Sequence, residues 1–109
     1  MLILLFPLLL GSTAALARTE HAQLTGLVRD LSGAVVPAAE IRVTNVATGI
    51  RRTATSNELG IHTVPLLEPG GYRVNVQRQG FRSIEHTGIT LEVNQVAPID
   101  FTLGLKVVF

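Results

Sequence analysis

Residues 72–77 alternate strictly between apolar and polar side chains, in the order Tyr72, Arg73, Val74, Asn75, Val76, Gln77. This period of two predicts a β-strand with one buried face and one solvated face. A helix would need apolar residues three and four positions apart, and the stretch 69–81 lacks that spacing. A turn of Pro69-Gly70-Gly71 precedes the strand, and Gly80 ends the alternation.

The same period recurs along most of the chain, between clusters of turn-forming residues. Further strands are predicted over residues 23–29, 40–45, 50–55, 61–64, 89–93 and 99–103. The segment 50–55 is rich in Thr and Arg, so we expect little of it to be buried. About seven short strands without a helical segment predict an all-β fold, a seven-stranded antiparallel Greek-key β-sandwich.

The inward-facing residues of these strands form the predicted core, between two sheets. Because the chain has no Trp and few aromatic residues, this core must be mainly aliphatic. The predicted structural core consists of Leu24, Val28, Ile41, Val43, Leu67, Tyr72, Val74, Val76, Phe81, Leu91, Phe101 and Leu103.

The first 17 residues differ from the rest of the chain. Residues 1–10 are almost wholly apolar, and Ala15-Leu16-Ala17 matches the small-x-small cleavage pattern of a secretory signal peptide. No Lys or Arg precedes the apolar run, and an uncleaved membrane anchor is the alternative. We therefore expect a helical signal segment over residues 1–17, a polar lead-in over 18–22 and an exported domain over 23–104.

The composition narrows the range of functions. A chain of 109 residues suits one domain, and a net charge of +1 gives no reason to expect nucleic acid as a partner. The five arginines Arg51, Arg52, Arg73, Arg78 and Arg82 have no aromatic residues interleaved with them, so a solvated face is predicted. The absence of cysteine excludes disulfides and thiolate chemistry.

No motif predicts catalysis. The histidines His21, His62 and His86 lack short metal-ligand spacing, and His62 is predicted to be a half-buried packing residue. The carboxylates are scattered, and no serine lies in a nucleophile elbow. We expect no catalytic residue, no metal and no cofactor.

Several short motifs together resemble carboxypeptidase regulatory-like domains. They are Gly26-Leu27-Val28-Arg29-Asp30, Ser32-Gly33-Ala34-Val35-Val36-Pro37, Ala39-Glu40-Ile41-Arg42-Val43-Thr44-Asn45, Asn57-Glu58-Leu59-Gly60 and Pro65-Leu66-Leu67-Glu68-Pro69-Gly70-Gly71-Tyr72. The resemblance runs from about Leu24 to Leu103. The family has an aromatic residue two positions after the loop glycine, where this chain has His62.

The resemblance implies a transthyretin-like (prealbumin-like) sandwich, grouped with carbohydrate-binding-like folds, that is itself non-catalytic. The variant with Ser-Gly-Ala-Val-Val-Pro looks most like the N-terminal domain of Oar-type TonB-dependent outer-membrane receptors. In those receptors the domain follows a signal peptide and precedes plug and barrel. Residues 105–109 would then begin a truncated linker.

The expected function is that of an exported accessory or interaction module in the periplasm or at the outer membrane. Its partner would be a protein that pairs with an exposed edge strand, or the remainder of a receptor. A carbohydrate-binding module is the alternative. A sugar ring usually stacks on exposed aromatics, and Tyr72, Phe81 and Phe101 are expected inside.

Overall fold

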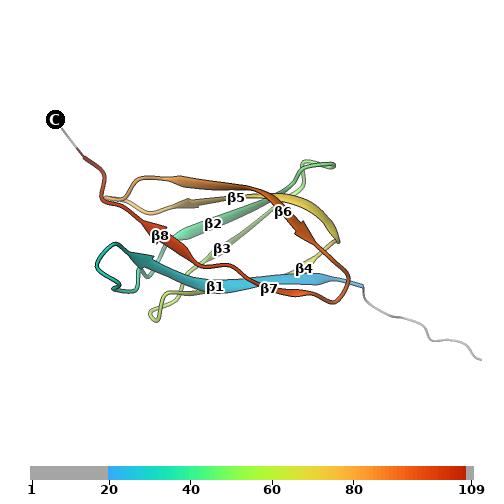
Figure 1. The fold of residues 1–109 in the computed structure, drawn as a ribbon, viewed down its shortest axis with the longest axis horizontal. Helices are drawn as coiled ribbons and strands as arrows, with labels where there is room; N and C mark the ends of the chain where they lie inside the picture. Colours follow the sequence, from blue (N-terminus) through green and yellow to red (C-terminus); the bar gives the residue numbers. More distant parts are fainter. Residues whose placement is uncertain (1–19, 108–109) are drawn as a thin grey trace, which may run out of the picture.

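The computed structural model describes residues 20–107 and shows two sheets packed face to face (Figure 1). The strands in chain order are β1 (Ala22–Asp30), β2 (Glu40–Asn45), β3 (Arg51–Thr55), β4 (Ile61–Leu67), β5 (Gly70–Gln77), β6 (Ile84–Leu91), β7 (Val96–Pro98) and β8 (Phe101–Leu103). One sheet has the order β3-β2-β5-β6. In the other sheet β1 is central, with β4 on one side and both β7 and β8 on the other.

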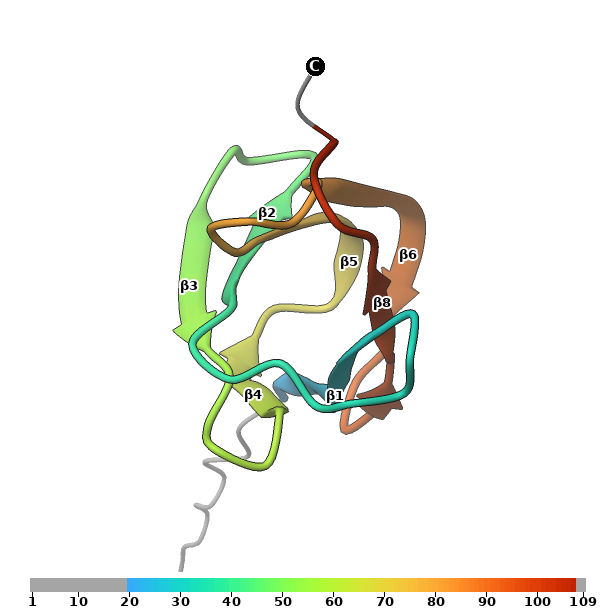
Figure 2. The ribbon, with the colours of Figure 1, turned by 90° about the vertical axis from the view of Figure 1, so that its left-hand side faces the viewer.

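The all-β sandwich predicted from the period of two is confirmed. β2 pairs with both β3 and β5 in antiparallel register, and β5 pairs with β6. The chain leaves this sheet to form β4 and then returns so that β5 lies beside β2 (Figure 2), the return that defines a Greek key. β5 contains the alternating stretch 72–77 and lies in the interior of its sheet.

Two details of the predicted sandwich are corrected. Residues 20–107 contain eight strands rather than seven, because β7 (Val96–Pro98) lies before the last predicted strand, 99–103, of which β8 forms the final part. The pairing is also not wholly antiparallel, since both β7 and β8 run parallel to β1. The chain crosses from one sheet to the other between β6 and β7, so the final strands join β1 without a hairpin.

The division between β7 and β8 lies where the chain passes closely over Gly26. A Cβ atom at Gly26 would lie 2.0 Å from the carbonyl oxygen of Ile99. Ile99 N–H donates to the Thr25 carbonyl at 2.7 Å, and Leu27 N–H donates to the Asp100 carboxylate at 2.8 Å. A side chain therefore accepts the hydrogen bond at this point of the ladder, and regular pairing resumes at Phe101.

The strand predicted over 61–64 extends further than expected. β4 continues through Pro65 to Leu67 because a bulge accommodates the proline. Ala22 pairs with Leu67 and Leu24 with Val64, so Pro65 and Leu66 together face one residue of β1. Leu66 has a φ of 59° and is exposed, whereas Leu67 is buried.

Residue 20 and residue 107 lie at opposite ends of the sandwich (Figure 1). The predicted signal segment over residues 1–17 lies outside the described residues. Among residues 20–107, no helix has the length and apolar character needed to cross a membrane.

Candidate functional site

The predicted core residues lie between the two sheets, with one exception. Phe81 is half-buried and packs against the edge of the core. The other eleven are buried, namely Leu24, Val28, Ile41, Val43, Leu67, Tyr72, Val74, Val76, Leu91, Phe101 and Leu103. The aromatic rings of Tyr72 and Phe101 are therefore not available to stack on a sugar.

His62 is buried more deeply than predicted, with only 1% of its surface exposed. Its ring centroid lies 5.3 Å from that of Phe101, and neither ring nitrogen has a hydrogen-bond partner among the described residues. The alternation of β4 places His62 on the inner face with Val64, so the aromatic position of the family is filled here by a titratable ring. Burial lowers the pKa of His62 below 6.5, and the charge of Asp100 opposes that shift.

The fold brings a second histidine to Phe101. The ring of His86, an exposed residue on β6, lies 4.9 Å from the Phe101 ring with an edge-on geometry. Two histidines far apart in the sequence thus contact one phenylalanine, which the sequence spacing did not indicate. Within residues 20–107 no three side chains of His, Cys, Asp or Glu converge as a metal site would require.

Several polar side chains that come close to other segments bind backbone groups. Ser56 accepts a hydrogen bond from Ala39 N–H at 2.9 Å and donates to the Val36 carbonyl at 2.7 Å. Asn45 accepts from the backbone N–H groups of Ala47 and Thr48, both at 3.0 Å. These side chains shape the entrance to β2 and the turn that leaves it.

Asp30 does the same in the loop after β1. Its carboxylate accepts from the Ser32 hydroxyl at 2.6 Å, from Ser32 N–H at 2.8 Å and from Ala34 N–H at 3.1 Å. The Ser32 hydroxyl contributes most to holding the pKa of Asp30 below its ordinary value. The carboxylate therefore stabilises the turn and is not a candidate general acid.

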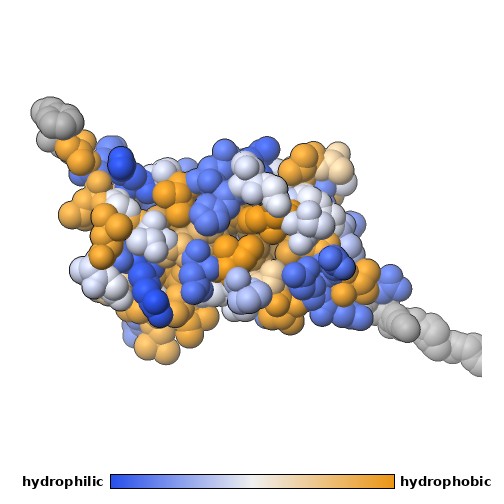
Figure 3. All heavy atoms as spheres, in the orientation of Figure 1, coloured by the Kyte–Doolittle hydropathy of each residue, from blue (hydrophilic) through white to orange (hydrophobic). Residues whose placement is uncertain are grey.

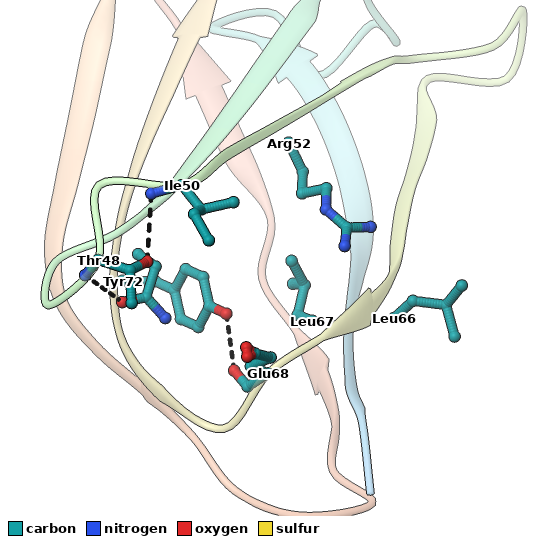
Figure 4. Close-up of a pocket in the computed structure, with 8 residues that line it drawn as sticks. Thr48, Ile50, Arg52, Leu66, Leu67, Glu68 and Tyr72 are labelled. Atoms are coloured by element: carbon teal, nitrogen blue, oxygen red, sulfur yellow. Dashed lines mark hydrogen bonds between the residues drawn. The ribbon is translucent and has the colours of Figure 1, made fainter. Parts of the chain in front are cut away.

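A small pocket of about 50 Å³ lies beside Tyr72, where the β2–β3 turn meets the end of β4 (Figure 4). The Tyr72 hydroxyl points across it and donates to the Glu68 carbonyl at 2.6 Å. Arg52 and Leu66 lie on its open side. The pocket has room for one or two water molecules, which is too little for a sugar ring.

A wider groove of about 570 Å³ lies at the opposite end of the sandwich. It is lined mainly by apolar side chains, including Leu31, Leu103, Leu105 and Val107. Figure 3 shows hydrophobic atoms at this end, and others are scattered among hydrophilic atoms over the rest of the face. Nothing in the structure shows what covers the groove.

The arginines form no single basic strip. Arg73 contacts Glu85 at 3.5 Å, Arg42 contacts Glu40 at 3.1 Å, and Arg78 donates to the Pro37 carbonyl at 3.0 Å. Arg51 and Arg52 lie together on β3, where the part of the chain that is described places no carboxylate within ion-pair distance of either. Of the five arginines of the predicted solvated face, only Arg73 pairs with a carboxylate among residues 20–107, and β3 keeps an unpaired positive charge.

Two features important to the site were missed from the sequence. Asp100 supplies a ladder hydrogen bond from a position that looked like the solvated face of a strand. Arg52 lies in a segment rich in Thr and Arg, which indicated only a polar strand. The fold places Arg52 beside the Tyr72 pocket. No signal local to either residue could have shown these contacts.

The family model for the carboxypeptidase regulatory-like domain matches residues 23–104, which confirms the resemblance seen in the motifs. A search of curated proteins finds no match.

Three solved structures show what the fold is similar to. The TIE protein of Bacillus anthracis aligns with a TM-score of 0.64 and 16% identity, over 79% of this chain and 17% of that protein. A candidate carbohydrate binding protein from Bacteroides uniformis aligns with a TM-score of 0.64 and 18% identity, over 77% of this chain and 41% of that protein. Hydroxyquinol 1,2-dioxygenase from Pseudomonas putida aligns with a TM-score of 0.65 and 12% identity, over 84% of this chain and 59% of that protein.

The chain therefore spans less than two thirds of each of these proteins. At such low identity the likeness concerns the fold alone, which here is common to an enzyme and to proteins of other descriptions.

Proposed function

We propose that this chain, which belongs to the carboxypeptidase regulatory-like domain family, is a non-catalytic binding module that acts in the cell envelope after export. One observation supports the proposal above others. The side chains of Asp30, Asn45, Ser56, Tyr72 and Asp100, at several places in the fold, each bind backbone groups of the same domain. They hold turns and strand junctions, so the remaining basis for function is recognition at the surface.

The proposed setting is the N-terminal accessory domain of a TonB-dependent outer-membrane receptor. The motif Ser32-Gly33-Ala34-Val35-Val36-Pro37 and the apolar residues 1–10 support it. The coding sequence downstream of Phe109 tests this setting. Plug and barrel sequences are expected there, and a stop codon without them would remove the receptor setting.

Export is tested by expressing the full chain in a Gram-negative host and measuring the mass of the product from each cell fraction. Cleavage after Ala17 and recovery from the periplasm are expected. An intact chain in the membrane fraction would indicate the anchor, and an intact chain in the cytoplasm would contradict export.

Carbohydrate binding is the second candidate, supported by the likeness to the Bacteroides uniformis protein. Glycan-array and calorimetric titration of the full chain distinguish the two candidates. Because Tyr72 and Phe101 are buried, we expect no retained glycan and no heat. Saturable glycan binding would instead favour the carbohydrate module.

A further inference from the structure

The two sheets have four edges, formed by β3, by β6, by β4 and by β7 together with β8. All of these edges except β3 are interrupted. β4 contains Pro65 and its bulge, and β7 and β8 have three residues each with the break at Ile99 and Asp100 between them. β6 has a bulge in which Thr87 and Gly88 face Arg73, with Gly88 at a φ of 73°. Such bulges, prolines and short lengths prevent an edge from pairing with another strand.

β3 is the edge that lacks these interruptions. Its five residues contain neither proline nor glycine, and its register with β2 runs without a shift from Thr44 opposite Arg51 to Glu40 opposite Thr55. β3 runs along the left side of Figure 2, and no strand from residues 20–107 lies outside it.

The hydrogen bonds at both ends of β3 show which of its backbone groups face away from β2. Asn45 N–H donates to the Ile50 carbonyl, and Ser56 N–H donates to the Ala39 carbonyl. Since bonded pairs alternate in an antiparallel ladder, Arg52 and Ala54 direct their backbone groups toward β2. The N–H and C=O groups of Arg51, Thr53 and Thr55 therefore point away from the sheet.

The side chains of β3 define two faces for an incoming strand. Arg51, Thr53 and Thr55 are on the solvated outer face of the sheet, and Ala54 packs against the edge of the core. Arg51 shares a row with Thr44 and Arg73, and Arg73 already contacts Glu85. The positive charge of Arg51 would thus meet a carboxylate on the outer face of the added strand, and Ala54 would meet an apolar residue on its inner face.

We propose that the open edge of β3 binds an extended peptide segment in which acidic and apolar residues alternate, added as a fifth strand beside β3. This inference rests on the proposed binding function and names its surface and its partner chemistry. A second copy of the chain fits less well, because each β3 carries two arginines and no carboxylate that could pair with those of the other copy.

The probe is a fluorescent synthetic peptide, Thr-Glu-Val-Glu-Val-Glu-Thr, titrated into the full chain and followed by polarisation. Saturable binding is expected, weakening as salt is raised because the charge contact is exposed. The same peptide with lysine in place of glutamate should bind at least about tenfold more weakly. On binding, the amides of Thr53 and Thr55 should exchange more slowly with solvent.

Two variants and one control variant locate the surface. Thr53→Pro removes an N–H that points away from β2. It should therefore weaken binding of the peptide by about tenfold without breaking the β2–β3 ladder. Thr53→Val keeps that N–H and is the matched control, expected to bind like the original chain. Arg51→Glu should reverse the preference toward the lysine peptide, which keeps the test informative if the proline variant fails to fold.

Three outcomes would overturn the inference. They are no saturation by the acidic peptide up to the order of 1 mM, equal binding by Thr53→Pro and the original chain, and concentration-dependent dimerisation that Thr53→Pro abolishes. If neither Thr53→Pro nor Arg51→Glu changes peptide binding, the chain would still be a binding module, but its binding surface would lie elsewhere than β3. Export and the downstream coding sequence test the proposed function independently.

Discussion

At the scale of single residues, His62 is the position where this chain differs most from what its inner strand face requires. The ring is buried against Phe101 with both nitrogens unpartnered among the described residues. Because burial lowers the pKa of His62 below 6.5, the unfolded chain binds this proton more readily than the folded chain. Stability contributed by the neutral ring is therefore present above about pH 6.5 and is lost as pH falls below it.

The substitution His62→Phe tests this linkage. The free energy of unfolding of the original chain should fall between pH 7.5 and 5.0, by up to about 1.4 kcal/mol per pH unit. His62→Phe should lose most of that dependence, because no proton is then taken up on unfolding at this site. Urea denaturation at several pH values measures both. His86→Gln, which changes the exposed histidine on Phe101, is the control and should keep the dependence.

Gly26 is required because another segment passes over it. In Gly26→Ala the new Cβ would clash with the Ile99 carbonyl, a backbone atom that cannot move alone. We expect a loss of about 3 kcal/mol in the free energy of unfolding. Gly71→Ala is the matched strand control, since a Cβ there meets nothing within 4 Å. Equal stability of the two variants in denaturant titrations would show that the close approach is not needed.

At the scale of elements, the junction between β7 and β8 depends on the Asp100 carboxylate. Asp100→Ala leaves Leu27 N–H without its acceptor, and we expect a loss of about 1 kcal/mol. Asp100→Asn keeps an oxygen at the same place and should lose less. Thermal unfolding compares the two variants. If Asp100→Asn is as damaging as Asp100→Ala, the charge rather than the acceptor is what matters.

The open edge of β3 has a signature of its own in amide hydrogen exchange. The N–H groups of Arg51, Thr53 and Thr55 should exchange quickly, while those of Arg52 and Ala54 should be protected by β2. Residue-resolved exchange by NMR measures this alternation. β2 is the internal control, because it is paired on both sides and its amides should all be protected. Uniform protection along β3 would mean that its edge is already covered.

At the scale of the whole molecule, the packing of the described domain draws on strands from β1 to β8. The buried hydrophobic cluster extends from Ala22 to Leu103. If residues 1–17 are a cleaved export signal, the chain that starts at Arg18 must fold without them. We expect this shorter chain to unfold cooperatively, with a melting temperature within a few degrees of the full chain. A large drop in the melting temperature would contradict the cleaved signal.

Much of the fold could be predicted because alternation is a property of the local chain. Val74 and Val76 face inward for the same reason that Arg73 and Asn75 face outward, namely the pleat of one strand. The prediction failed where a strand departs from that pleat. Pro65 was expected to end its strand, and the bulge absorbs it. β7 has only three residues and includes Pro98, which is too short for a period to be read.

The sequence alone determined the all-β class, the family and a chain without catalytic motifs, because these depend on residue types and on neighbours a few positions apart. It also indicated that residues 50–55 form a polar strand. Only the tertiary structure decided that β3 is an uninterrupted edge, that His62 is fully buried and that Asp100 completes the β1 ladder. These features arise from segments far apart in the chain, whose contacts exist only once the two sheets have packed.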